Sequence, residues 1–500
     1  MFRASLSAFV AASILLGAPA LAERRDAPIT ERQLMRHIEV LASDAFEGRA
    51  PGSPGEALTT AYIVRELQRR GLEPGGRDGS WFQPVPLMEF SAGAHRIRWS
   101  TAVGRDVAFD EARIILASRE PSKRLERAPA VFVGHGFVDH ARGIDQLAGV
   151  DLGGAIAFVL LEGPDVAGFP GFEERALAVA AAGAAAVIAV LPDAEAWSAL
   201  VEAAREPHMA LDDDRGPRML GVIPAEDLGS LVAASGGDLA ALLNEQAGPT
   251  FRAVPLSLRA TIELTSEVRR FTSNNVIGRI RGTGGGGESV LLLGHWDHLG
   301  LCGTEGEADR ICNGAVDNAS GIATLIEVAG RLAARRPERD VLVLATTAEE
   351  PGLFGAEHFA SSPTVPIESI VAAVNVDMVA IHGRGEPVAV IGRGIEPLDR
   401  AIAETAAALG RPMDTTYAAD SFVQRQDGWA LARAGIPAVM VGGSLANTAA
   451  LEAYLSSDYH GPGDEARSDL PLAGAAEDSD LVVALTRRLA DPAHYRPPTR

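Results

Sequence analysis

Acidic and histidine side chains follow four apolar runs in the second half of the chain. The runs cover residues 290–294, 341–347, 370–376 and 438–441, and the polar side chains after them are His295, Asp297 and His298, then Glu349 and Glu350, then Asp377 and, further on, His460. A short apolar run bounded by turn residues is typical of a buried strand. In open α/β sheets, ligands bind beyond the carboxyl ends of the strands. The pattern therefore predicts that these side chains share one site.

A set of imidazole and carboxylate groups suits a pair of divalent metal ions. Two ions about 3.5–4 Å apart can hold both an attacking water and the carbonyl of a substrate, and zinc binds nitrogen and oxygen ligands. Adjacent residues of an extended chain point in opposite directions. Glu349 and Glu350 should therefore not both bind metal; Glu350 is the predicted ligand, and Glu349 is free to act as a base. The predicted ligands are His295, Asp317, Glu350, Asp377 and His460.

Three neighbours of these ligands have other predicted roles. Asp297 is two residues after His295, so it should point the same way and orient the imidazole from behind. By the same alternation, His298 should point away from the metals, as a loop residue or an outer partner of the ligands. Asp317 precedes an apolar, Ala-rich segment and can be a helix N-cap as well as a ligand. His358 is predicted to be a surface histidine.

The composition excludes some classes of function. The chain has 500 residues, a formal net charge of −21, and 22% charged and 47% hydrophobic residues, as in a folded, soluble protein. Nucleic-acid binding requires a basic stripe, so no nucleic acid partner is expected. The tripeptide Asp212–Asp214 fits no known calcium loop and is predicted to be a solvated loop.

The first 22 residues have the features of a signal peptide. Arg3 supplies the positive start, residues 4–17 the apolar stretch, and Ala20 to Ala22 the small-residue cleavage site. No later run is long and apolar enough to cross a bilayer. We expect cleavage near Ala22 and export to the periplasm or the medium, without stable membrane insertion.

The chain contains two cysteines, Cys302 and Cys312, between the His295 cluster and Asp317. An exported compartment permits disulfides. Closing such a short loop would contribute roughly 2–3 kcal/mol through chain entropy. We predict a disulfide, with two free buried thiols as the alternative.

The alternation of strand-like and helix-like segments predicts an α/β protein with a mixed, mostly parallel sheet flanked by helices. Helices are expected to begin with the capping box Thr30–Gln33 and to cover residues 57–68, 321–334 and 398–409. Residues 121–258 have a strand, helix, strand pattern without metal-ligand spacing and are predicted to be an inserted, smaller domain rich in strands. The predicted division is 1–22 signal peptide, 23–120 and 259–500 main domain, and 121–258 insert.

Five motifs of the chain resemble the M28 family of dinuclear zinc peptidases, in order and spacing. They are His295–Gly300, Asn313–Gly321, Ala348–Gly355, Asn375–Met378 and Tyr459–Asp464. Residues 41–49 resemble the bacterial secreted aminopeptidases of that family, and 121–258 resemble a protease-associated (PA) domain. The resemblance covers nearly the whole chain after the signal peptide.

The resemblance implies a role for each residue. His295 and Asp377 would hold one zinc, Glu350 and His460 the other, with Asp317 bridging the two Zn²⁺. Glu349 would be the general base that accepts the proton of the metal-bridging water. Tyr459 would polarise the scissile carbonyl, and Asp297 would assist from behind His295. The implied activity is an aminopeptidase that hydrolyses N-terminal peptide bonds of peptide substrates.

One departure from the family pattern leaves the substrate preference open. Many relatives have Ser-Asp-His before a Gly-Ile-Pro stretch, whereas this chain has Gln426-Asp427-Gly428 before Gly435. A carboxypeptidase is the first alternative, with Arg393 or Arg425 gripping a terminal carboxylate. A glutaminyl cyclase, which works with one zinc and no PA insert, and a non-catalytic receptor-like module are the others.

Overall fold

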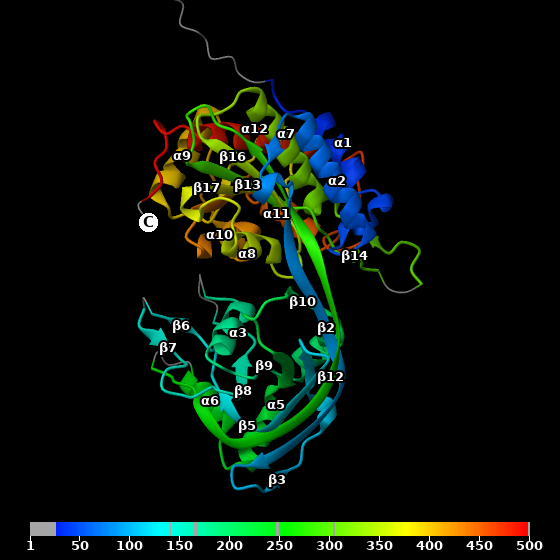
Figure 1. Ribbon diagram of the computed structural model, residues 1–500, viewed down its shortest axis with the longest axis vertical. Coiled ribbons are helices and arrows are strands. Elements are labelled where there is room, and N and C mark those ends of the chain that lie inside the picture. The colour runs from blue at the N-terminus through cyan, green and yellow to red at the C-terminus, as the bar shows by residue number, and fades with distance from the viewer. Residues whose placement is uncertain (1–26, 141, 165–168, 247–249, 304–305, 499–500) are drawn as a thin grey trace, which may run out of the picture.

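A computed structural model describes residues 27–498, apart from residues 141, 165–168, 247–249 and 304–305. The predicted signal peptide and its cleavage site therefore lie outside the described residues. The described chain forms two bodies joined by two very long strands (Figure 1), β2 (Phe82–Thr101) and β12 (Val254–Ile280), which pair antiparallel over most of their length. No helix in this part of the chain has the length and apolarity to cross a membrane.

The upper body in Figure 1 is built on a mixed sheet with the strand order β18-β19-β17-β13-β16-β12. Strand β13 pairs parallel with β16 and β17, and β17 pairs parallel with β19, while the outer strands β18 and β12 are antiparallel. These strands are β13 (Ser289–His295), β16 (Asp340–Thr346), β17 (Ile370–Asn375), β18 (Ala389–Ile391) and β19 (Ala438–Gly442). The predicted fold class, a mostly parallel α/β sheet flanked by helices, is confirmed.

Helices cover both faces of this sheet (Figure 1). They are α1 (Glu31–Leu41), α2 (Pro54–Arg69), α7 (Gly321–Ala334), α8 (Phe354–Ser361), α9 (Glu396–Ala408), α10 (Asp427–Arg433), α11 (Thr448–Leu455) and α12 (Leu472–Leu489). The predicted capping box opens α1, because Thr30 accepts from the backbone of Gln33 and the Gln33 side chain returns to Thr30. Helix α7 has the predicted bounds, and its apolar face packs on the central strands.

In the lower body the sheet continues beyond β12, in the strand order β5-β8-β9-β11-β4, and has its own apolar core. Its strands are β4 (Ile115–Ser118), β5 (Ser122–Phe132), β8 (Ile156–Leu160), β9 (Ala186–Leu191) and β11 (Met219–Pro224), with β3 (Asp106–Val107) and β10 (His208–Leu211) on β2. Its helices are α3 (Phe172–Ala181), α4 (Ala194–Leu200), α5 (Ala225–Ala234) and α6 (Leu239–Gln246).

The core of this insert begins before residue 121. Trp99 of β2 and Leu116 of β4 are buried in the same cluster as Phe132 and Phe158. Strand β4 pairs with β11 inside the insert. Residues 97–118 therefore pack with the insert, although the sequence pattern assigned them to the main domain, because their loose alternation did not show which body they join.

Candidate metal centre

The cluster is assembled where four elements end or begin on one edge of the main sheet. His295 is the last residue of β13, and Glu349 and Glu350 follow β16. Asp377 comes two residues after β17, and Asp317 lies in the helical turn Ala315–Ser320 before α7. Parallel strands bring their carboxyl ends to the same edge, so residues far apart in the sequence meet there.

Asp317 lies between two groups of side chains. Its Oδ1 is 3.2 Å from His295 Nε2, which is also 3.3 Å from Asp377 Oδ1. Its Oδ2 is 3.4 Å from His460 Nε2, which is 2.9 Å from Glu350 Oε2. One carboxylate thus faces two donor sets with one oxygen each, which is the arrangement a bridging ligand requires.

The donor atoms have the spacing and chemistry that zinc needs. Ligands about 2.0–2.1 Å from a tetrahedral zinc lie about 3.3–3.4 Å from one another, close to the separations around Asp317. His295, Asp317 and Asp377 offer ligand atoms within 4.8 Å of one another, as do His298, Asp317 and Glu350. His460 Nε2 is buried and, although 2.9 Å from Glu350 Oε2, is not aligned for a hydrogen bond with any described residue. Carboxylates gathered in a buried site require compensating positive charge, so the residues fit a metal pair.

The tautomer of His295 is set by a bond on the far side of its ring. Its Nδ1 donates to the main-chain oxygen of Asp297 at 3.1 Å and is 3.9 Å from the nearer carboxylate oxygen of that residue. The lone pair of Nε2 is therefore directed towards Asp317 and Asp377. Asp297 is thus behind His295, where it was expected, but the bond comes from its backbone.

The carboxylate of Asp297 has a different partner, the backbone N–H of Glu349, from which Oδ1 accepts at 3.1 Å. Its other oxygen is buried without a hydrogen-bond partner. Burial raises the pKa of Asp297 to about 7, and the negative charge of Glu350 adds to this rise against the opposing effect of His295. Asp297 therefore joins His295 to the residue that was predicted to act as a base.

The two glutamates have different surroundings. Burial raises the pKa of Glu349 well above its ordinary value, and the nearby acids Asp427 and Asp377 add to the effect. Glu350 has a lowered pKa because its contacts with His298 and His460 outweigh the cost of its burial. Glu349 is therefore the more basic of the two carboxylates and Glu350 the less basic, as a base and a ligand require.

His298 does not point away from the cluster as expected, but it is an outer partner of a predicted ligand, as the same prediction allowed. Its Nδ1 lies 2.5 Å from Glu350 Oε1, and its ring meets that of His460 edge-on at 5.8 Å. The alternation of side chains applies only to extended backbone, and β13 ends at His295, so it does not extend to His298. A separation of 2.5 Å is that of a hydrogen bond, too short for two ligands of one zinc.

A small pocket opens on the cluster. It is lined by His295, Asp317, Glu349, Glu350, Asp377, Met378, Phe422, Arg425, Leu455 and Tyr459. Tyr459 stacks on His460 with 3.7 Å between ring centroids, and its hydroxyl is 3.5 Å from Arg425. Burial raises the pKa of Tyr459 above its ordinary value, so the phenol stays a hydrogen-bond donor. The apolar lining from Met378, Phe422 and Leu455 was not predicted, since these residues belong to no charged motif.

The two candidate arginines differ. Arg393 pairs with Asp420 and lies over the Tyr417 ring at 3.7 Å, so its charge is already matched. Arg425 lies over Phe422 and, within the described residues, has no carboxylate partner, neither Asp420 nor Asp427. Asp427 is instead buried and accepts from the hydroxyl of Thr346 at 2.5 Å.

Two residues that had no predicted role form hydrogen bonds to the loops that carry the cluster. The guanidinium of Arg49 is fully buried and donates to the main-chain oxygens of Leu41, Trp296, Asn313 and Gly314. Asp464 accepts from the N–H groups of Val316 and Asp317 at 2.9 and 3.0 Å. Both residues lie in motifs quoted for the family resemblance, which is the signal that could have found them.

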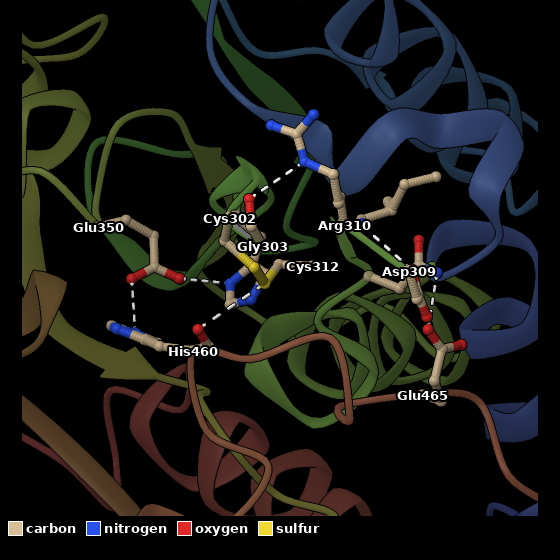
Figure 2. Close-up of a disulfide and its surroundings, with 11 residues drawn as sticks. Cys302, Gly303, Asp309, Arg310, Cys312, Glu350, His460 and Glu465 are labelled. Carbon is tan, nitrogen blue, oxygen red and sulfur yellow. Dashed lines mark hydrogen bonds and ion pairs between the residues drawn. A yellow bond between two sulfur atoms is a disulfide. The ribbon is translucent and has the colours of Figure 1, made fainter. Parts of the chain in front are cut away.

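Cys302 and Cys312 are bonded to each other, with 5.8 Å between their Cα atoms, so the predicted disulfide is confirmed. The bridge lies beside His460 and Glu350 (Figure 2), and Cys312 Sγ is 3.7 Å from the main-chain oxygen of His460. It closes the loop that connects β13 to Asp317. His358, predicted at the surface, is partly buried on α8.

The profile of peptidase family M28 matches residues 275–485, which contain every predicted ligand. Residues 275–485, which carry the candidate metal centre, belong to peptidase family M28. Membership confirms the predicted enzyme class, a metallopeptidase and therefore a hydrolase.

Curated relatives of this M28 chain include a probable zinc metalloprotease of the fungus Leptosphaeria maculans. It is 31% identical over 106 residues, which are 21% of this chain and 24% of that protein. A vacuolar membrane protease of Schizosaccharomyces japonicus is 33% identical over 89 residues, 18% of this chain and 9% of that protein. The matches thus span a quarter or less of the length of these relatives.

Among solved structures, an aminopeptidase from Aneurinibacillus sp. strain AM-1 has a similar fold over both bodies. The superposition has a TM-score of 0.52 at 18% identity and covers 95% of this chain and 97% of that one. The two-body architecture of this M28 protein therefore occurs in another solved structure.

Proposed function

We propose that this M28 protein is an exported dinuclear zinc aminopeptidase that hydrolyses N-terminal peptide bonds. The observation that carries the proposal is the position of Asp317, whose two oxygens face His295 and His460 at 3.2 and 3.4 Å. His295 and Asp377 would hold one zinc, and Glu350 and His460 the other. Two zinc ions would supply Lewis acidity towards a carbonyl and a water of lowered pKa.

The side chains of the protein supply the remaining chemistry. Glu349 accepts the proton of the attacking water and delivers it to the departing amine, a role that suits a carboxylate whose pKa is raised by burial. Tyr459 keeps its phenolic proton and donates it in a hydrogen bond to the oxygen that becomes negative. Asp297 holds the backbone of Glu349, which limits where the base can be.

The charge of the pocket favours an amino terminus as the recognised group. Glu349, Glu350 and Asp377 line it together with Asp317, and a protonated α-amino group binds most strongly where carboxylates are desolvated. The net charge of −21 attracts cations in addition. Arg425 is the observation that favours the second candidate, a carboxypeptidase, because its guanidinium lines the same pocket without a carboxylate partner among the described residues.

Two further parts of the proposal concern the rest of the chain. We propose that the insert is a PA domain, because it has an apolar core of its own and interrupts the peptidase body between β2 and β12 in the sequence. We propose export because of the signal-peptide pattern of residues 1–22, with which the Cys302–Cys312 disulfide agrees.

Matched peptides decide which terminus is read. We expect N-acetylation of a peptide to reduce kcat/KM by about 10- to 100-fold, the value of a lost hydrogen bond to a charged group, while C-amidation leaves it nearly unchanged. Rates are measured by chromatography of the released amino acid. The opposite pattern would replace the aminopeptidase with the carboxypeptidase and make Arg425 its terminus-binding residue.

Metal content tests the dinuclear site separately. Purified protein is expected to contain close to two zinc per chain, since the donors around Asp317 form two sets. Elemental analysis after dialysis gives the number, and Asp317→Asn is expected to lower it because one substitution alters both sets. Full activity with a single zinc would favour the glutaminyl cyclase alternative.

A further inference from the structure

The residue before the proposed base is held by the insert. Ala348 is fully buried in a small cluster with Val85, Leu87 and Leu211, against which Phe354 also packs. Leu211 is on β10, a strand of the insert, which lies at the edge of the lower body below α8 (Figure 1). An insert side chain therefore belongs to the same buried apolar cluster as the residue that precedes Glu349.

The backbone of this loop has a conformation that needs support. Ala348 has a φ of +51°, a left-handed conformation that residues with a side chain rarely adopt. Its main-chain oxygen accepts from the N–H of Phe354 at 2.8 Å, and the N–H of Glu349 is held by Asp297. Such a conformation persists only where the surroundings hold it, and it is frequent at functional sites.

Strand β10 is itself firmly placed. It pairs antiparallel with β2, with Leu211 opposite Leu87 and His208 opposite Phe90. The next residue, Asp212, donates its N–H to the main-chain oxygen of Pro86 at 2.9 Å. Since β2 continues from the insert into the main body, β10 is fixed relative to β16 and the loop after it.

We propose that Leu211 is a positioning residue for catalysis: it holds Ala348 and thereby sets the place of the Glu349 carboxylate. The insert then contributes to the rate of the reaction and not only to access or partner binding. This inference depends on the role of Glu349 in the proposed function. Its physical basis is that a shift of about 1 Å in a reacting group can reduce a rate by about 10²-fold.

The test compares Leu211→Ala with Leu228→Ala, a buried leucine in the core of the insert that does not contact Ala348. We expect Leu211→Ala to lower kcat by about 10- to 100-fold, with an almost unchanged KM and the same zinc content as the wild type. Leu228→Ala should retain the wild-type kcat. Leu211→Met should recover most of the activity, because it conserves side-chain volume. An equal kcat in the two alanine variants would overturn the proposal.

Amide hydrogen exchange gives a readout that does not need substrate. We expect the segment 348–354 to exchange at least about tenfold faster in Leu211→Ala than in Leu228→Ala, because local opening depends on local packing. Unchanged exchange would show that Leu211 does not hold the loop, whatever the activity. A wild-type protein that cleaves no peptide would refute the proposed function, while the exchange would still decide the contact. If Leu211→Ala does not fold, Leu211→Val replaces it in both measurements.

Discussion

Glu349→Gln is expected to reduce kcat by about 10²- to 10⁴-fold, the usual contribution of a positioned general base. The amide keeps the shape of the side chain but cannot accept a proton. Glu349 is not among the residues grouped around the two candidate metal positions, so the variant should retain its zinc. Steady-state kinetics with a peptide substrate, together with elemental analysis, provide the measurement.

Glu350→Gln is the matched control, because it makes the same change at the neighbouring residue. Glu350 contacts His460 at 2.9 Å and His298 at 2.5 Å, so its amide should weaken zinc binding as well as activity. The two variants thus separate loss of a base from loss of a ligand. An active Glu349→Gln together with a Glu350→Gln that keeps both metals would reverse our assignment of the pair.

Arg49→Met is expected to have the largest effect on stability. The methionine fills part of the same space but leaves the main-chain oxygens of Leu41, Trp296, Asn313 and Gly314 without their donor. A buried group left unsatisfied costs about 1–3 kcal/mol, so four of them cost on the order of 4–12 kcal/mol, against a typical total of about 5–15 kcal/mol. We expect unfolding at a much lower temperature, measured by circular dichroism, and loss of zinc.

The control for this prediction is Arg36→Met on α1. Arg36 is 61% exposed, and its buried partner Glu327 also pairs with Arg70 and His37, so loss of the Arg36 contact should cost little. Its variant should unfold near the wild-type temperature. Equal unfolding temperatures for the two methionine variants would show that the Arg49 bonds do not stabilise the metal-binding loops. Arg49→Lys should be intermediate, because an ammonium group has three donors and no planar fork.

The strand-end argument predicted the position of the cluster for a simple reason. Apolar runs such as 290–294 and 341–347 are strands whose length and direction follow from local sequence, and parallel strands end at one edge. The same local logic predicted the capping box of α1 and the bounds of α7. It failed at His298, because the backbone there is no longer extended and successive side chains no longer point to opposite sides.

Other features depend on contacts between distant segments. The pocket lining joins Phe422 and Leu455 to Glu349, and no local pattern indicates that these residues approach one another. Arg49 is a turn residue by sequence and, in the structure, a buried donor to the two loops that carry the candidate ligands His295 and Asp317. Leu211 is an ordinary strand residue whose neighbour Ala348 is over a hundred positions away.

The sequence by itself thus determined the chemistry: which side chains can bind metal, which strands carry them and that a bridge between Cys302 and Cys312 is possible. These properties depend on residue type and on short-range periodicity, and both can be read directly from a single sequence. The tertiary structure decided which residues hold that chemistry in place. Asp297 accepts a hydrogen bond from the backbone of Glu349, Arg49 joins two loops, and β10 of the insert packs in one cluster with Ala348. Such contacts follow from how two bodies and their long shared strands pack, and packing is a property of the whole fold.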